Sequence, residues 1–151
     1  MKQPRRRILS AMAGMALAPL LPARRAGAPI EALDGEVRKI VGDRPLQSGR
    51  VKLEIPRLAD NGHSVPLSIV VDSPMSATEY VHRITLLSER NPRPLMATFH
   101  LGPHAGKAVV ATRVRLAGTQ RLLAIALLSD QSYWSGTAEI VVTESACLDE
   151  S

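Results

Sequence analysis

The sequence predicts an all-β sandwich of about seven short strands, preceded by a short N-terminal helix. Two observations lead to this fold class: apolar residues recur in short runs, several of which alternate with polar residues, and clusters of Gly, Pro, Asp or Ser separate the runs. The runs follow one another at intervals of roughly 8 to 12 residues, and such spacing is typical of a sandwich.

The first 28 residues have the features of an export signal. Lys2 and Arg5, Arg6 and Arg7 precede an apolar run over residues 8–21, which is shorter than the roughly 20 residues that a membrane span needs. The arginines are followed by two apolar residues, as in twin-arginine signals. Small residues at 26–28 suit a signal peptidase, although Pro29 disfavours cleavage directly before it. We expect export without a membrane anchor; an uncleaved anchor is the alternative.

Most of the basic character of the chain belongs to this segment. The whole chain has a net charge of +5, but residues 1–28 hold six of its nineteen Lys and Arg residues and none of its fourteen acids. The remainder therefore has thirteen basic and fourteen acidic residues, a net charge of −1. With only four aromatic residues in addition, the sequence argues against nucleic-acid binding. We expect one small exported domain.

The strands are expected in order along the second part of the chain. Val51, Leu53 and Ile55 alternate with charged residues until Pro56, a pattern typical of a half-buried strand. A turn is expected at residues 59–62, which contain Asn-Gly. The further strands are expected at residues 65–71, 80–87, 95–101, 107–116, 121–128 and 137–143. For residues 121–128 the Leu and Ala content also permits a helix, but the segment is short for one.

A helix is expected only at residues 30–41. Apolar residues there fall on one helical face, and Gly42 stands at the position of a C-terminal cap. The resulting division of the chain is an export signal (1–28), a short helix and linker (29–49), a sandwich (50–143) and a cysteine-bearing tail (144–151).

The sequence contains no pattern that indicates an active site of its own. His100 and His104 are separated by Gly102-Pro103, which excludes a shared helical face, and no Cys or acidic cluster adjoins them. The segment 129–132, Ser-Asp-Gln-Ser, is expected to be a turn without a catalytic triad. No glycine-rich phosphate loop occurs. We therefore expect neither an enzyme nor a bound metal or cofactor.

The single cysteine, Cys147, lies in the C-terminal tail. A lone cysteine in an oxidising compartment indicates pairing with another protein or a reactive free thiol. Four extended residues reach about 13 Å beyond the last strand, enough to place a sulfur in another protein's pocket. This is the arrangement that a carrier of covalently bound cargo needs.

Four segments of the chain resemble the SoxY family of thiosulfate-oxidation carrier proteins: LEIP (53–56), DNGHSVPLSIVVDSPM (60–75), NPRPLMATFHLGP (91–103) and TRVRLAGTQRLLAIALLSDQSYW (112–134). The resemblance extends from about Glu31 to Thr143. It implies an immunoglobulin-like sandwich, twin-arginine export to the periplasm and a heterodimer with a second small β-protein, SoxZ. It also implies that Cys147 covalently carries sulfur intermediates between haem and dimanganese partner enzymes.

The tail departs from the family pattern around the cysteine. The family arm is Gly-Gly-Cys-Gly-Gly, whereas residues 145–149 are Ser-Ala-Cys-Leu-Asp. Without glycine the backbone has fewer allowed conformations, and Glu144, Asp149 and Glu150 should raise the pKa of the thiol. We expect a slower or differently partnered carrier. A structural or regulatory relative that has lost transfer, and a stand-alone binding module of the cell envelope, are the alternatives.

Two apolar features have more than one interpretation. Residues 122–128 contain too many apolar positions for one buried face, which fits a strand covered on both sides or a central core strand. Tyr133 and Trp134 fit either a partner interface or the end of the sandwich.

Overall fold

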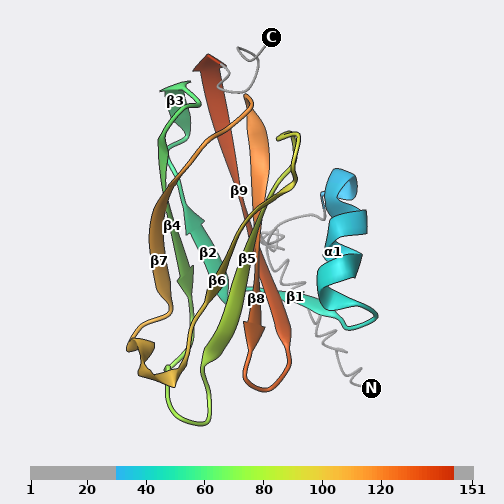
Figure 1. Cartoon of the computed structure of the whole chain (residues 1–151), viewed down its shortest axis with the longest axis vertical. Coiled ribbons are helices and arrows are strands. Elements are labelled where there is room, and N and C mark those ends of the chain that lie inside the picture. Colours follow the sequence, from blue (N-terminus) through green and yellow to red (C-terminus); the bar gives the residue numbers. More distant parts are fainter. Residues whose placement is uncertain (1–29, 145–151) are drawn as a thin grey trace, which may run out of the picture.

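The computed structural model describes residues 30–144, which form a two-layer β-sandwich with one helix outside it (Figure 1). The strands of the larger sheet lie in the order β1-β9-β8-β5-β6, and β3 pairs with the C-terminal part of β9. The smaller sheet has the order β2-β4-β7. The expected all-β sandwich with an N-terminal helix is confirmed. No helix of the described residues is long and apolar enough to cross a membrane.

The elements have the following bounds. The strands are β1 Leu46–Ser48, β2 Val51–Glu54, β3 Leu58–Asn61, β4 Val65–Val71, β5 Val81–Ser88, β6 Leu95–His100, β7 Val109–Val114, β8 Gln120–Leu128 and β9 Tyr133–Glu144. The helical segments are η1 Glu31–Leu33, α1 Asp34–Val41 and η2 Pro103–Ala105.

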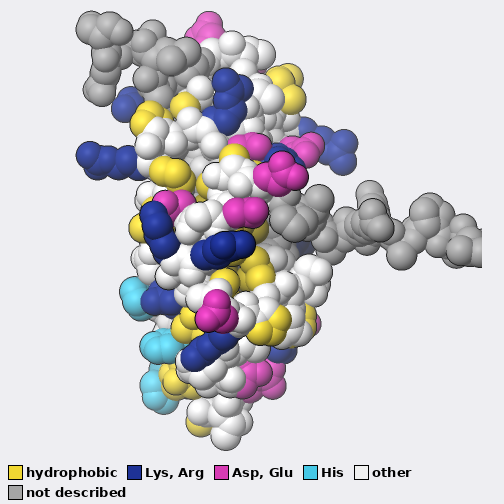
Figure 2. All heavy atoms as spheres, turned by 90° about the vertical axis from the view of Figure 1, so that its right-hand side faces the viewer, with side chains coloured by type: hydrophobic (Ala, Val, Ile, Leu, Met, Phe, Trp, Pro, Cys, Tyr) yellow, Lys and Arg dark blue, Asp and Glu magenta, His cyan; other side chains and the backbone are white. Residues whose placement is uncertain are grey.

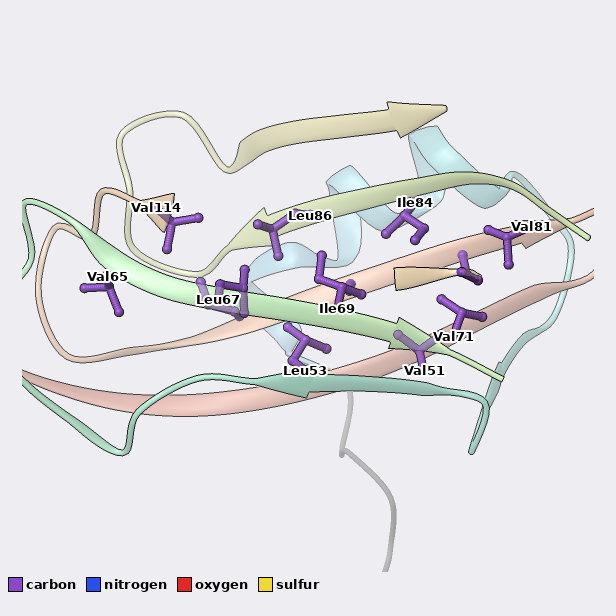
Figure 3. Packing of buried hydrophobic residues seen from close by; sticks show 14 of the residues in the cluster. Val51, Leu53, Val65, Leu67, Ile69, Val71, Val81, Ile84, Leu86 and Val114 are labelled. Carbon is purple, nitrogen blue, oxygen red and sulfur yellow. The ribbon is translucent and has the colours of Figure 1, made fainter. Parts of the chain in front are cut away.

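The main core lies between the two sheets. Alternate residues of β4 point inward, and Val65, Leu67, Ile69 and Val71 are all buried. They meet apolar residues of the larger sheet, among them Ile84 and Leu86 (Figure 3). The apolar run that was expected to form this strand therefore has a burial period of two.

The other face of β8 forms a second, smaller core beneath α1. The inner set of β8 is Leu122, Ala124, Ala126 and Leu128, and the outer set is Leu123, Ile125 and Leu127. The outer set packs with Ile30, Leu33 and Val41 from the N-terminal helical segment. Residues 121–128 thus form a strand rather than a helix, and β8 is covered on both sides within this chain.

Tyr133 and Trp134 divide between the two cores. Tyr133 is buried in the second core, while Trp134 is half-buried against the first. The Trp134 Nε1–H donates a hydrogen bond of 2.9 Å to Ser132 Oγ, and the Arg50 guanidinium lies 5.3 Å from the centre of its ring. These contacts favour the interpretation that the two residues close the sandwich.

The structure has more strands than the sequence predicts. β1 lies in the expected linker, β3 overlaps the expected turn at residues 59–62, and β9 begins at Tyr133 rather than at residue 137. Both short strands pair with β9 in parallel, whereas β2, which lies between them along the chain, belongs to the other sheet. Most residues of β1 and β3 are exposed, so no alternation of apolar residues reveals them.

Gly136 lets β9 approach β2 closely. A Cβ atom at Gly136 would lie 2.1 Å from the backbone oxygen of Val51, a distance that real Cβ atoms do not adopt. The glycine is therefore required by the contact between the sheets and not by a turn.

Candidate functional site

The predicted attachment site, Cys147, lies outside the described residues, as does the predicted export signal. The described part of the chain ends at Glu144, the last residue of β9. The candidate site is therefore the base from which the cysteine-bearing tail continues.

Strand β3 holds one side of this base. Leu58 is in register with Val141, and Asn61 with Glu144. The Gly62 N–H donates a hydrogen bond of 2.9 Å to the Glu144 carbonyl. In addition, the Thr143 hydroxyl donates to the carbonyl of Asp60. The end of β9 is thus paired up to the last described residue.

Thr119 holds the other side, beside β8. Its hydroxyl oxygen accepts a hydrogen bond of 3.0 Å from the Val142 N–H and lies 3.3 Å from the Val142 carbonyl, to which it donates. One side chain thus satisfies both backbone groups of one β9 residue. Because β9 is held from both sides, the tail starts from a defined position.

The turn after β3 connects the base to β7. The Gly62 carbonyl accepts a hydrogen bond of 2.8 Å from the Leu116 N–H, just beyond β7. Arg113 of β7 donates to the Ser64 hydroxyl at 2.7 Å and to the Ser64 carbonyl at 3.1 Å. Gly62 therefore bonds to the end of β9 on one side and to the end of β7 on the other.

An open groove of about 930 Å³ lies on the outer face of β8 and β9 near the base. It is lined by residues of both charges, including Arg57, Arg121, Glu89 and Glu139. Arg121 Nη2 lies 2.9 Å from Glu89 Oε1, and the hydrogen bond between them lowers the pKa of Glu89 and raises the pKa of Arg121. Acidic and basic side chains are interspersed over this side of the molecule (Figure 2).

The histidines do not form a site. His63, His82, His100 and His104 are all exposed, and histidine side chains lie along one margin of the lower half in Figure 2. Within residues 30–144, no three or more His, Cys, Asp or Glu residues are grouped so that they could hold a metal ion. The structure thus does not bring His100 and His104 into a metal centre.

The polar residues at 129–132 stabilise a turn. The hydroxyl and the N–H of Ser132 donate to the Asp130 carboxylate at 2.6 and 2.9 Å, and these bonds lower the pKa of Asp130. The Asp130 carboxylate, the Ser132 hydroxyl and the Trp134 indole form one short chain of hydrogen bonds. Its members bond to one another and not to a histidine.

The residues that hold the base were not predicted from the sequence. The Asn-Gly pair at 61–62 indicated a turn, but nothing marked Gly62 as a bridge to Glu144. Thr119 is separated from Val142 by 22 residues along the chain, and no pattern of residue types indicates their contact. Only the pairing of β3, β8 and β9 brings these residues together.

Comparison with known proteins agrees with the fold. The SoxY structure from Chlorobium limicola f thiosulfatophilum, described as a sulfur carrier protein, superimposes with a TM-score of 0.62 at 25% identity, over 74% of this chain and 96% of that chain. Superoxide reductase (neelaredoxin) from Ignicoccus hospitalis superimposes with a TM-score of 0.56 at 20% identity, over 62% of this chain and 80% of that chain. The superoxide reductase from Nanoarchaeum equitans superimposes with a TM-score of 0.54 at 15% identity, over 64% of this chain and 100% of that chain. The two reductases show a shared fold only.

A search of curated proteins found no match. The family model of the sulfur oxidation protein SoxY, however, matches residues 37–147, from within α1 to the cysteine itself. This match covers well over half of the chain. The chain therefore belongs to the SoxY family.

Proposed function

We propose that this protein is a periplasmic sulfur carrier of thiosulfate oxidation, with Cys147 as its covalent attachment site. The observation that carries the proposal is the family match, which includes Cys147 as its last residue. The similar Chlorobium protein is itself described as a sulfur carrier. The protein is then not an enzyme, and its thiol is a substrate for partner enzymes. The proposed partner is a SoxZ-like β-protein, with which this chain forms a heterodimer. The proposed means of export is the twin-arginine route.

The loading step joins the Cys147 sulfur to the outer sulfur of thiosulfate. One S–S bond forms, the thiol proton leaves, and two electrons pass to a haem partner enzyme. Hydrolysis by a dimanganese partner then breaks the bond to the sulfonate group. Water supplies the fourth oxygen of the released sulfate, two protons leave, and one sulfur atom stays on Cys147. The chain itself contributes the thiol and its position.

The geometry of the base supports this role. Cys147 is three residues beyond Glu144, so its sulfur can move within about 10 Å of a defined starting point. Hydrogen bonds from Gly62 and to Thr119 keep that starting point in place. A short tether on a fixed base limits the search for a partner's active site.

A second candidate is a relative that keeps the fold and has lost transfer. The observation that favours it is the replacement of all four glycines around the cysteine, at positions 145, 146, 148 and 149. Side chains at these positions restrict how the tail can enter a narrow channel.

The test is the intact mass of the protein from the periplasm of its native host grown on thiosulfate, before and after reduction. The carrier proposal expects added mass that reduction removes, that maps to Cys147 and that is absent from the C147S variant. A clean thiol, under conditions that load a glycine-armed relative, would support the second candidate. In that case glycines at 145, 146, 148 and 149 should restore loading. Co-purification with a SoxZ-like protein tests the heterodimer separately.

A further inference from the structure

A second groove lies on the side of the sandwich where β6 and β7 form the edges of different sheets. It has a volume of about 400 Å³. Arg93 lines one side, and Arg113 and Arg115 line the other. No acidic residue among those that the structure describes lines it.

The three arginines present charge that the described residues do not neutralise. All three are exposed. Arg113 bonds only to Ser64 and Arg115 to the His63 ring at 3.4 Å, neither of which is an acid. Arg93 has no hydrogen bond or ion pair to any of residues 30–144. A guanidinium can bind a carboxylate through two parallel hydrogen bonds, so this groove selects an acidic occupant.

This groove begins next to the base of the tail. Gly62 bonds to Glu144 at one side and to Leu116 at the other, and Leu116 directly follows Arg115. Arg113 is bonded to Ser64 in the same turn. Two backbone hydrogen bonds therefore connect the last described residue of β9 to the chain that lines the groove.

The seven residues after Glu144 have the length and the charge for this groove. Their sequence, SACLDES, contains Asp149 and Glu150 but no basic residue, and fully extended they span about 23 Å. Four strand residues along β7 cover only about 13 Å. The larger groove near Arg57 is a poorer site for this segment, because Glu89 and Glu139 line it and Arg121 is already paired.

We propose that the acidic end of the tail, residues 148–151, docks in the groove formed by Arg93, Arg113 and Arg115. The docked tail holds Cys147 against the body of the protein, and a partner enzyme must displace it to reach the thiol. The docking itself does not require that Cys147 carry sulfur. Its consequence for loading rests on the proposed function, so the two can fail separately.

The test uses Cys147 as the single attachment point for a nitroxide on the full-length, ¹⁵N-labelled protein. We expect the nitroxide to broaden the backbone amides of residues 93–97 and 112–115 more than those that line the groove near Arg57. In the R93Q/R113Q/R115Q variant the ratio of docked to free tail should fall about tenfold, as expected for the loss of three exposed ion pairs. In 1 M salt, where charges are screened beyond about 3 Å, it should fall similarly.

Matched variants separate specific docking from a change in net charge. R38Q/R83Q/K107Q removes the same charge outside the groove and should keep the pattern. On the tail, D149N/E150Q should also lower the ratio of docked to free tail, while D34N/D43N should leave it unchanged. Equal broadening of both grooves, or a pattern that the groove variant leaves unchanged, would overturn the proposal. So would broadening that appears only between labelled and unlabelled molecules, since the occupant would then be a second copy.

Discussion

The two ends of β9 are held by different kinds of contact. At its first residue, Tyr133 is buried in the second core beneath α1, among apolar side chains. At its last residues, the contacts are hydrogen bonds that involve Gly62, Thr119 and Thr143, on a largely exposed stretch. One strand therefore joins the second core to the base of the cysteine-bearing tail.

The difference separates stability from positioning. Burial of apolar area is non-directional and supplies most of the favourable free energy of folding. Exposed hydrogen bonds contribute little net free energy but fix direction and register. We therefore expect changes at the Tyr133 end to lower global stability and changes at the Glu144 end to loosen the base of the tail while the fold remains.

The largest expected effect comes from the buried end. Tyr133→Ala removes a ring from the second core and should lower the free energy of unfolding by about 3–5 kcal/mol. Chemical denaturation measures this. Tyr133→Phe is the matched control and should stay close to the original protein, because the hydroxyl has no hydrogen-bond partner among the described residues. A loss as large in the Phe variant would show that the ring is not what stabilises this end.

Substitution in the middle of β9 should lower the free energy of unfolding by nearly as much. Gly136→Ala places a Cβ atom against the Val51 backbone oxygen, and because backbone cannot move aside cheaply, we expect a loss of about 3 kcal/mol. Gly102→Ala is the control, since a Cβ there meets nothing within 4 Å. Equal midpoints of thermal unfolding for the two variants would contradict the close approach of β9 and β2.

The smallest expected effect comes from the base of the tail. Thr119→Val keeps the shape of the side chain but removes both hydrogen bonds to Val142, at a cost of about 1 kcal/mol. Amide hydrogen exchange should become faster at residues 141–144 and stay unchanged at Tyr133. Thr112→Val, whose hydroxyl makes only a long contact of 3.5 Å to Arg113, serves as control. An unchanged rate of amide hydrogen exchange at Val142 would show that Thr119 does not hold the end of β9.

The sequence alone predicted the strands whose one face is buried. In β2 the burial alternates with the residue types, so the pattern of apolar residues predicts directly which side chains enter the core. β4 was expected as an apolar run, and every second residue of that run is buried. The double cover of β8 was also predicted as a possibility, because both of its faces are apolar, although the sequence did not say that α1 provides the outer cover.

The sequence also determined the chemistry of the tail: one cysteine, no neighbouring glycine and an excess of acids. Only the tertiary structure decided where this tail begins and what lies beside it. β3 is a strand because β9 offers it hydrogen bonds from residues 141–144, and such bonds join backbone groups that every residue except proline has. Backbone pairing leaves no signature in residue type, so the base of the tail and the arginine groove next to it become visible only once the chain is folded.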